Sequence, residues 1–253
     1  MSFQPGNATV FTGYERVRQA AHAFGKTARP LAVVAPGMSG AQLAAAVEAC
    51  RRPGVLRAVV TTDSDVVRQC ADLGVDVVFH LSPEELATGS TALVPLPGFE
   101  DAAASAARLL RVVGLTRATL LAVCESEYPA LWQAQRAAHD FGGEVTVLRV
   151  PIVRRPDGVP VGSVAPGDTP GEDAIALSAA LAGCALVAED GPQACLDFAA
   201  RVAPAATFRA TDLQLGDAPA VGEGCIFGYL GAHRDVAFVP FGIGVRPDPS
   251  DNG

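Results

Sequence analysis

The chain has 253 residues, and its 27 acidic side chains outnumber its 19 basic ones, so the formal net charge is −8 at pH 7. Proteins that bind nucleic acids usually present a basic surface that neutralises phosphates, so this balance argues against that class. Apolar residues make up 49% of the chain and charged residues 18%. This composition excludes wholesale disorder and allows a large core in one domain or in two fused halves.

The sequence also argues against a membrane protein and against a disulfide-rich one. Arg, Asp, Gly or Pro interrupts every apolar run before the roughly 18 to 20 residues that a membrane-spanning helix needs, and the start, MSFQPG, lacks the features of a secretion signal. We therefore expect a cytoplasmic protein. The six cysteines form no C-x-x-C pair, which suits neither a disulfide framework nor a zinc site. Most of them are expected to be buried thiols.

From residue 30 onward, short apolar runs alternate with alanine-rich stretches. In the first part of the chain this pattern predicts strands at 31–34, 56–60, 75–79, 92–94 and 118–123, and helices at 40–52, 64–73 and 100–113. In the last part it predicts helices at 172–181, 192–202 and 216–230, and strands at 184–188, 207–209 and 236–239. A Pro/Gly-rich loop at 154–171 is predicted between an α/β half at 1–153 and another at 172–253. The strands are continuously apolar, which is typical of an α/β fold whose sheet is covered by helices on both faces.

Cys124 ends a predicted strand and precedes a long alanine-rich helix. The segment from Leu120 to Gly143 reads LLAVCESEYPALWQAQRAAHDFGG. The unpaired N–H groups and the positive dipole end at the start of that helix would favour the thiolate form of Cys124 over the thiol. The alternative interpretation is a buried cysteine that only packs at the end of a strand.

The same segment resembles the nucleophile segment of the thiolase-like superfamily, in particular that of ketosynthase III-like enzymes. The positions that carry the resemblance are Cys124, Ser126, Ala130-Leu131, Ala134 and Gly142. Flanking segments follow in the family's order, namely VGLTRA at 113–118, TPGEDAIAL at 169–177, LGDAPAVG at 215–222 and VPFGIG at 239–244. The resemblance implies a thiolase-like layered fold of two α/β halves, in which helices sandwich mixed sheets, and it implies a homodimer.

The resemblance further implies that Cys124 accepts an acyl group from a thioester of coenzyme A or of an acyl carrier protein, with no other cofactor. Backbone N–H groups near Gly242 would stabilise the oxyanion, and Ser126 would contact the substrate. Asp190 and Asp217 stand where ketosynthase III-like enzymes have His and Asn. An ionised carboxylate cannot donate the hydrogen bonds that His and Asn donate. The two aspartates are therefore expected either to act as base or orienting groups, or to mark lost chemistry.

Three arginines form a basic cluster beside the Pro/Gly-rich loop of this acidic chain: Arg149, Arg154 and Arg155. They are predicted to receive the phosphates of coenzyme A or to face an acidic carrier protein. A solvated loop with no binding role is the alternative.

A glycine-containing segment, APGMSG at 35–40, follows a predicted strand and opens a predicted helix. It is similar to the dinucleotide-binding fingerprint, but Ala35 replaces the first glycine, and Asp63 follows 28 residues later rather than the expected ~20. The preferred interpretation is a β–α turn without a nicotinamide site. The four histidines lack the spacing of a metal site, so no metal is predicted.

Two other functions remain open at this stage. The replaced His and Asn favour a catalytically silent ketosynthase-like partner subunit. The alternation of strands and helices alone also fits a two-lobed sensor that binds a small molecule between its lobes.

Overall fold

The computed structural model describes residues 6–27, 29–87, 93, 102–140, 145–164, 168–211, 223–231 and 233–240. The chain divides into two compact units, Met1–Val153 and Arg154–Gly253, and each unit is described by itself. Within the described residues, no helix combines the length and the apolar character needed to cross a membrane.

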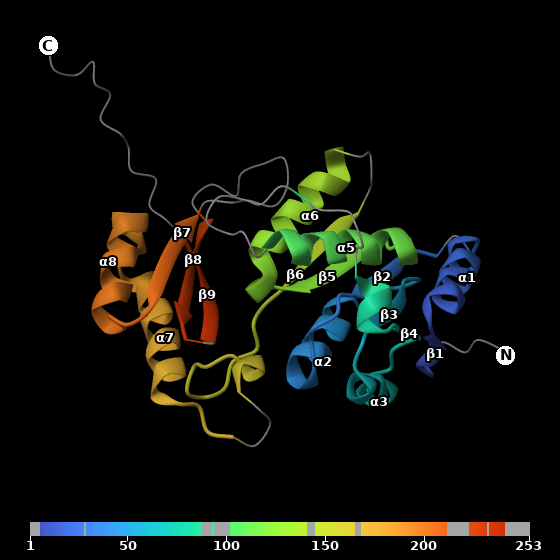
Figure 1. Ribbon diagram of the computed structural model, residues 1–253, viewed down its shortest axis with the longest axis horizontal. Coiled ribbons are helices and arrows are strands. Elements are labelled where there is room, and N and C mark those ends of the chain that lie inside the picture. The colour runs from blue at the N-terminus through green and yellow to red at the C-terminus, as the bar shows by residue number, and fades with distance from the viewer. Residues whose placement is uncertain are drawn as a thin grey trace, which may run out of the picture. The chain divides into compact units, whose positions relative to one another are not determined.

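A six-stranded parallel sheet forms the centre of the first unit (Figure 1). The strands lie in the order β1-β4-β3-β2-β5-β6. Their bounds are β1 Thr9–Thr12, β2 Leu31–Val34, β3 Leu56–Thr61, β4 Val77–His80, β5 Leu120–Cys124 and β6 Thr146–Val150. Every residue of β2 and β5 is buried, as expected for central strands of a parallel sheet that is covered on both faces.

Helices cover both faces of this sheet. They are α1 Tyr14–Gly25, α2 Gly40–Ala49, α3 Ser64–Asp72, α4 Pro83–Leu86, α5 Ala102–Thr116 and α6 Tyr128–Asp140, with the 3-10 turn η1 Glu125–Glu127 before α6. Figure 1 shows α5 and α6 on one face and α2 and α3 on the other. Helices α5 and α6 contact each other, and each buries small alanine side chains, such as Ala106 on α5 and Ala134 on α6.

The second unit contains a three-stranded antiparallel sheet and two main helices. The strands, in the order β7-β8-β9, are β7 Thr207–Thr211, β8 Glu223–Leu230 and β9 His233–Pro240. The helices are α7 Glu172–Gly183 and α8 Pro192–Val202, with the 3-10 turns η2 Val161–Ser163, η3 Cys184–Leu186 and η4 Ala188–Asp190. A Cβ atom at Gly228 would lie 2.6 Å from Leu177 Cδ1, so a larger residue there would force side chains to shift where α7 packs on β8.

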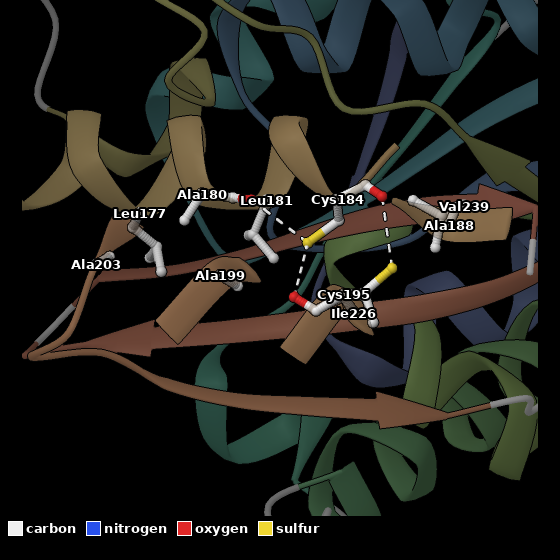
Figure 2. Packing of buried hydrophobic residues seen from close by; sticks show 10 residues of the cluster. All are labelled: Leu177, Ala180, Leu181, Cys184, Ala188, Cys195, Ala199, Ala203, Ile226 and Val239. Carbon is white, nitrogen blue, oxygen red and sulfur yellow. Dashed lines mark hydrogen bonds between the residues drawn. The ribbon is translucent and has the colours of Figure 1, made fainter. Parts of the chain in front are cut away.

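Two cysteines lie in the core of the second unit, between η3 and α8 (Figure 2). The Cys184 thiol lies 3.5 Å from the carbonyl oxygen of Cys195, and the Cys195 thiol lies 3.4 Å from the carbonyl oxygen of Cys184. Both side chains are fully buried among the apolar residues that Figure 2 labels. These thiols therefore act as small core side chains that also donate weak hydrogen bonds.

The α/β class is confirmed, but several of the expected details are wrong. The large sheet is parallel throughout rather than mixed. Residues 184–188 form 3-10 turns instead of a strand, and Leu186 is 82% exposed. Residues 223–230 form strand β8 rather than the end of a helix. Short apolar runs do not by themselves distinguish a strand from a helix, which explains both errors. Of the strand predicted at 92–94 only residue 93 is described, and residues 216–222 of the predicted helix lie outside the described residues.

Candidate functional site

The chain changes direction at the centre of the six-stranded sheet. From β2 it continues through α2 to β3 on one side, and from β5 it continues through η1 and α6 to β6 on the other side. The loops that follow β2 and β5 therefore diverge at the carboxyl ends of two adjacent strands. In open α/β sheets, ligands bind outside the carboxyl ends of the strands at such a switch point. We call residues 35–42, 124–129 and 149–153, which lie at this place, the switch-point edge.

The turn from β2 into α2 brings backbone N–H groups to this edge. The Ala35 N–H donates to the carbonyl oxygen of Ala122, at 2.9 Å, which fastens the turn to β5. Gly37 has a φ of 100°, which favours glycine over other residues. The Gln69 side chain accepts a hydrogen bond from the Gly40 N–H, and within the described chain the Ser39 side chain caps none of the first N–H groups of α2. Such a helix start can hold an anion.

Gln42, in the first turn of α2, joins this helix to the segment that follows β6. Its Nε2 donates to the carbonyl oxygen of Pro151 at 3.0 Å, and its Oε1 accepts from the Val153 N–H at 2.7 Å. The side chain is 8% exposed. Both polar ends of a buried amide are thus used, which is the condition for its burial without a net penalty.

Glu125, directly after β5, holds the same segment from the other side of the switch point. Its Oε2 accepts a hydrogen bond from the Ile152 N–H at 3.3 Å, and its Oε1 lies 3.2 Å from Arg149 Nε. The segment after β6, residues 151–153, is therefore held by side chains from the two other segments of the edge, Gln42 after β2 and Glu125 after β5.

The switch-point edge carries little positive charge. Arg149 is the basic residue of its three segments, and Glu125 and Glu127 are the acidic ones, so the sum is 1 − 2 = −1. The chain's single lysine, Lys26, lies at the C-terminal end of α1. Because helices in β–α–β units run antiparallel to the strands, this lysine belongs to the opposite, amino edge of the sheet.

The structure does not support an activated thiolate at Cys124. The side chain is 9% exposed, and burial raises the pKa of its thiol, opposed by hydrogen bonds from Ser126 and reinforced by the nearby carboxylates of Glu125 and Glu127. Helix α6 begins only at Tyr128, so the turn η1 separates the sulfur from the helix start. The helix dipole therefore does not determine the ionisation of Cys124.

A thiol titration of the native protein tests this description. All six cysteines are buried, so at neutral pH a dithiobenzoate reagent is expected to react with fewer than one thiol per chain within minutes, and with all six in denaturant. Rapid reaction of one thiol, mapped to Cys124 by peptide mass spectrometry, would contradict it.

The other residues expected in a thioester site are spread over the two units. Ser126 lies beside Cys124, and Arg149 is paired with Glu125. In the second unit, Arg154 is held by Asp235, Arg155 is held by Asp157, and Asp190 ends the turn η4 at the surface. Asp217 and Gly242 lie outside the described residues. The arginines therefore already have ion-pair partners.

Comparisons with known proteins decide the family. No model of a known protein family matches the chain. A pantothenate synthetase of Corynebacterium jeikeium is 32% identical over an alignment of 293 residues, which covers 97% of this chain and 94% of that protein. The chain belongs to the pantothenate synthetase family. A pantothenate synthetase of Saccharopolyspora erythraea is 33% identical over 190 residues, covering 70% of this chain and 58% of that protein.

Solved structures agree on the fold of the pantothenate synthetase family. A pantothenate synthetase from Thermus thermophilus superposes with a TM-score of 0.69 at 21% identity, covering 92% of this chain and 99% of that one. A pantoate-β-alanine ligase from Francisella tularensis superposes with a TM-score of 0.62 at 12% identity, covering 91% and 97%.

These relatives correct the sequence-based identification. The thiolase-like, ketosynthase III-like assignment is wrong, and so is the function that it implied, an acyl transfer from coenzyme A or an acyl carrier protein through Cys124. The likeness reflects a buried strand followed by an alanine-rich helix, which many α/β folds contain. Gln42 and Glu125 were missed. The signal for Gln42 was a single amide in the otherwise apolar stretch GAQLAAAV.

Proposed function

We propose that this protein is an ATP-dependent ligase that joins pantoate and β-alanine through an amide bond. The observation that carries the proposal is the 32% identity to the Corynebacterium jeikeium pantothenate synthetase over nearly the whole of both chains. The Francisella tularensis neighbour, a pantoate-β-alanine ligase, is described in complex with "beta-gamma ATP" and β-alanine.

The switch-point edge is the proposed place of reaction. ATP supplies the activation that a carboxylate needs before an amine can displace an oxygen from it. The chain itself contributes the N–H groups at the start of α2, which suit a phosphate, and the turn at Gly37, whose missing side chain lets a ligand approach the backbone. Gln42 and Glu125 hold the neighbouring backbone in place.

The test is direct formation of product. Purified protein is incubated with pantoate, β-alanine and ATP, and pantothenate is measured by mass spectrometry, with reactions lacking each reactant as controls. The proposal expects product only in the complete mixture. It also expects Cys124→Ala to keep the activity, because the thiol has no role in this chemistry. Absence of product at enzyme concentrations equal to those of the substrates would contradict the proposal.

A second candidate is a family member that binds the small substrates without turning over ATP. The observation that favours it is the charge of the switch-point edge, where Arg149 is paired with Glu125 and Lys26 belongs to the opposite edge. Electrostatic stabilisation of a transferring phosphoryl group normally uses Arg, Lys or a metal ion. The product assay and calorimetry together identify the second candidate, which expects heat on binding of pantoate or β-alanine but no product with ATP.

Two expectations from the sequence stay proposals. A homodimer is tested by sedimentation equilibrium of the purified protein. The cytoplasmic location is tested by fractionation of cells that express it.

A further inference from the structure

The last three residues of the first unit are held from two sides, and the next residue belongs to the second unit. Gln42 holds Pro151 and Val153, and Glu125 holds Ile152. Arg154, the first residue of the second unit, makes two hydrogen bonds to the Asp235 carboxylate at 2.7 and 2.9 Å. Residues 151–153 are therefore fixed within the first unit by side chains from α2 and from the turn after β5.

The hydrogen bonds that Gln42 and Glu125 make to residues 151–153 differ in length and in burial. The Glu125 contact to Ile152 N is 3.3 Å long, and Glu125 also pairs with Arg149. Gln42 makes a 2.7 Å contact and a 3.0 Å contact to the same segment and is almost fully buried. Gln42 reaches this segment across 109 and 111 residues of sequence from within the first turn of α2, the helix that begins at the switch-point edge.

We infer that Gln42 is a positioning residue, which fixes the backbone of 151–153 against the start of α2 and so sets the shape of the switch-point edge for its ligand. This inference rests on the proposed function for the identity of that ligand, ATP. Gln42 acts through the backbone that it holds, and no contact with substrate is assigned to it.

Two variants separate the two hydrogen bonds. Gln42→Leu removes both at nearly constant volume. Gln42→Glu keeps the acceptor for the Val153 N–H but places a carboxylate oxygen against the carbonyl of Pro151. The matched control is Gln19→Leu, which removes an exposed side-chain hydrogen bond on α1. Hydrogen exchange of the Val153 amide and the affinity for ATP are measured for all four proteins.

In Gln42→Leu, Val153 exchange is expected to rise about tenfold and ATP affinity to fall about tenfold, as expected for loss of a buried hydrogen bond. Gln42→Glu is expected to show less change in exchange than Gln42→Leu, and Gln19→Leu no change in either measurement. In steady state, KM for ATP is expected to rise more than kcat falls, which a general loss of folded protein would not produce.

The alternative outcomes are distinct. Unchanged Val153 exchange in Gln42→Leu overturns the inference, because Gln42 then does not hold the segment. Faster exchange with unchanged ATP affinity also overturns it, because the segment then does not shape the site. A wild-type protein that binds ATP but forms no pantothenate contradicts the proposed ligase activity alone, and the exchange and affinity measurements still decide the role of Gln42. A wild-type protein that does not bind ATP overturns both.

Discussion

Replacing Asp235 by alanine is expected to lower the free energy of unfolding of the second unit by about 1.5 to 3 kcal/mol, because it removes the carboxylate that accepts hydrogen bonds from Arg154 and from the Ser178 hydroxyl. The Asp235 carboxylate is 1% exposed and is paired with Arg154. It also accepts hydrogen bonds from the Ser178 hydroxyl at 2.8 Å and from its neighbouring Val236 N–H at 2.7 Å. Urea unfolding followed by circular dichroism, with hydrogen exchange of peptides from β8 and β9, measures the effect.

Two further variants test whether the effect of Asp235 comes from its ion pair with Arg154. Asp197→Ala removes an exposed carboxylate that contacts only the Gln193 side chain among the described residues, and it is expected to change stability by less than about 0.5 kcal/mol. The double variant Asp235→Leu, Arg154→Met removes both charges and is expected to cost less than the sum of the single changes. Additive costs would show that the two side chains do not interact in solution.

Raising the pH above about 9 is expected to destabilise the protein through its buried thiols. Burial raises the pKa of Cys50 and of Cys70 from 9.0 to about 11, and that of Cys184 to about 12. Between these values the unfolded chain has lost thiol protons that the folded protein still binds, so stability falls as pH rises. The stability that the protonated thiols contribute to the folded protein is fully present below pH 9 and is lost by about pH 11 to 12. One pKa unit corresponds to about 1.4 kcal/mol per thiol.

Urea unfolding at pH 8, 9, 10 and 10.5 measures this dependence. Cys50→Ala and Cys70→Ala are each expected to make the decline shallower, whatever their cost at pH 8, because each removes one titrating group. The variant Asp197→Ala keeps all six thiols and is expected to leave the slope unchanged. Equal slopes in all variants would show that the thiols ionise alike in the folded and unfolded chains.

Much of the secondary structure could be predicted from local patterns. The all-apolar runs at 31–34 and 120–124 are central strands, and Pro192 starts α8 at the predicted residue because its fixed φ suits a first helical position. The more mixed run at 9–12, with alternating exposure in β1, gave no such signal. The order of the strands depends on contacts between distant segments, which periodicity does not contain.

The site was harder to predict than the fold, for two physical reasons. The sequence predicted a reactive Cys124 because a strand, a cysteine and a helix follow each other. In the structure the turn η1 separates the thiol from the helix, and burial raises the pKa of the thiol. The sequence did not predict a role for Gln42, because its hydrogen-bond partners lie 109 and 111 residues away. A local pattern identifies a residue that acts within its own turn, but it cannot identify one whose partners lie far away in the sequence.

Photoaffinity labelling with an azido-ATP tests most directly whether the nucleotide binds at the switch-point edge. The labelled protein is digested and the modified peptides are identified by mass spectrometry, with unlabelled ATP as competitor. The account predicts ATP-protected labels on peptides that contain residues 35–42, 124–129 or 149–153. Competable labelling found only in other peptides, with none on these three segments, would contradict it.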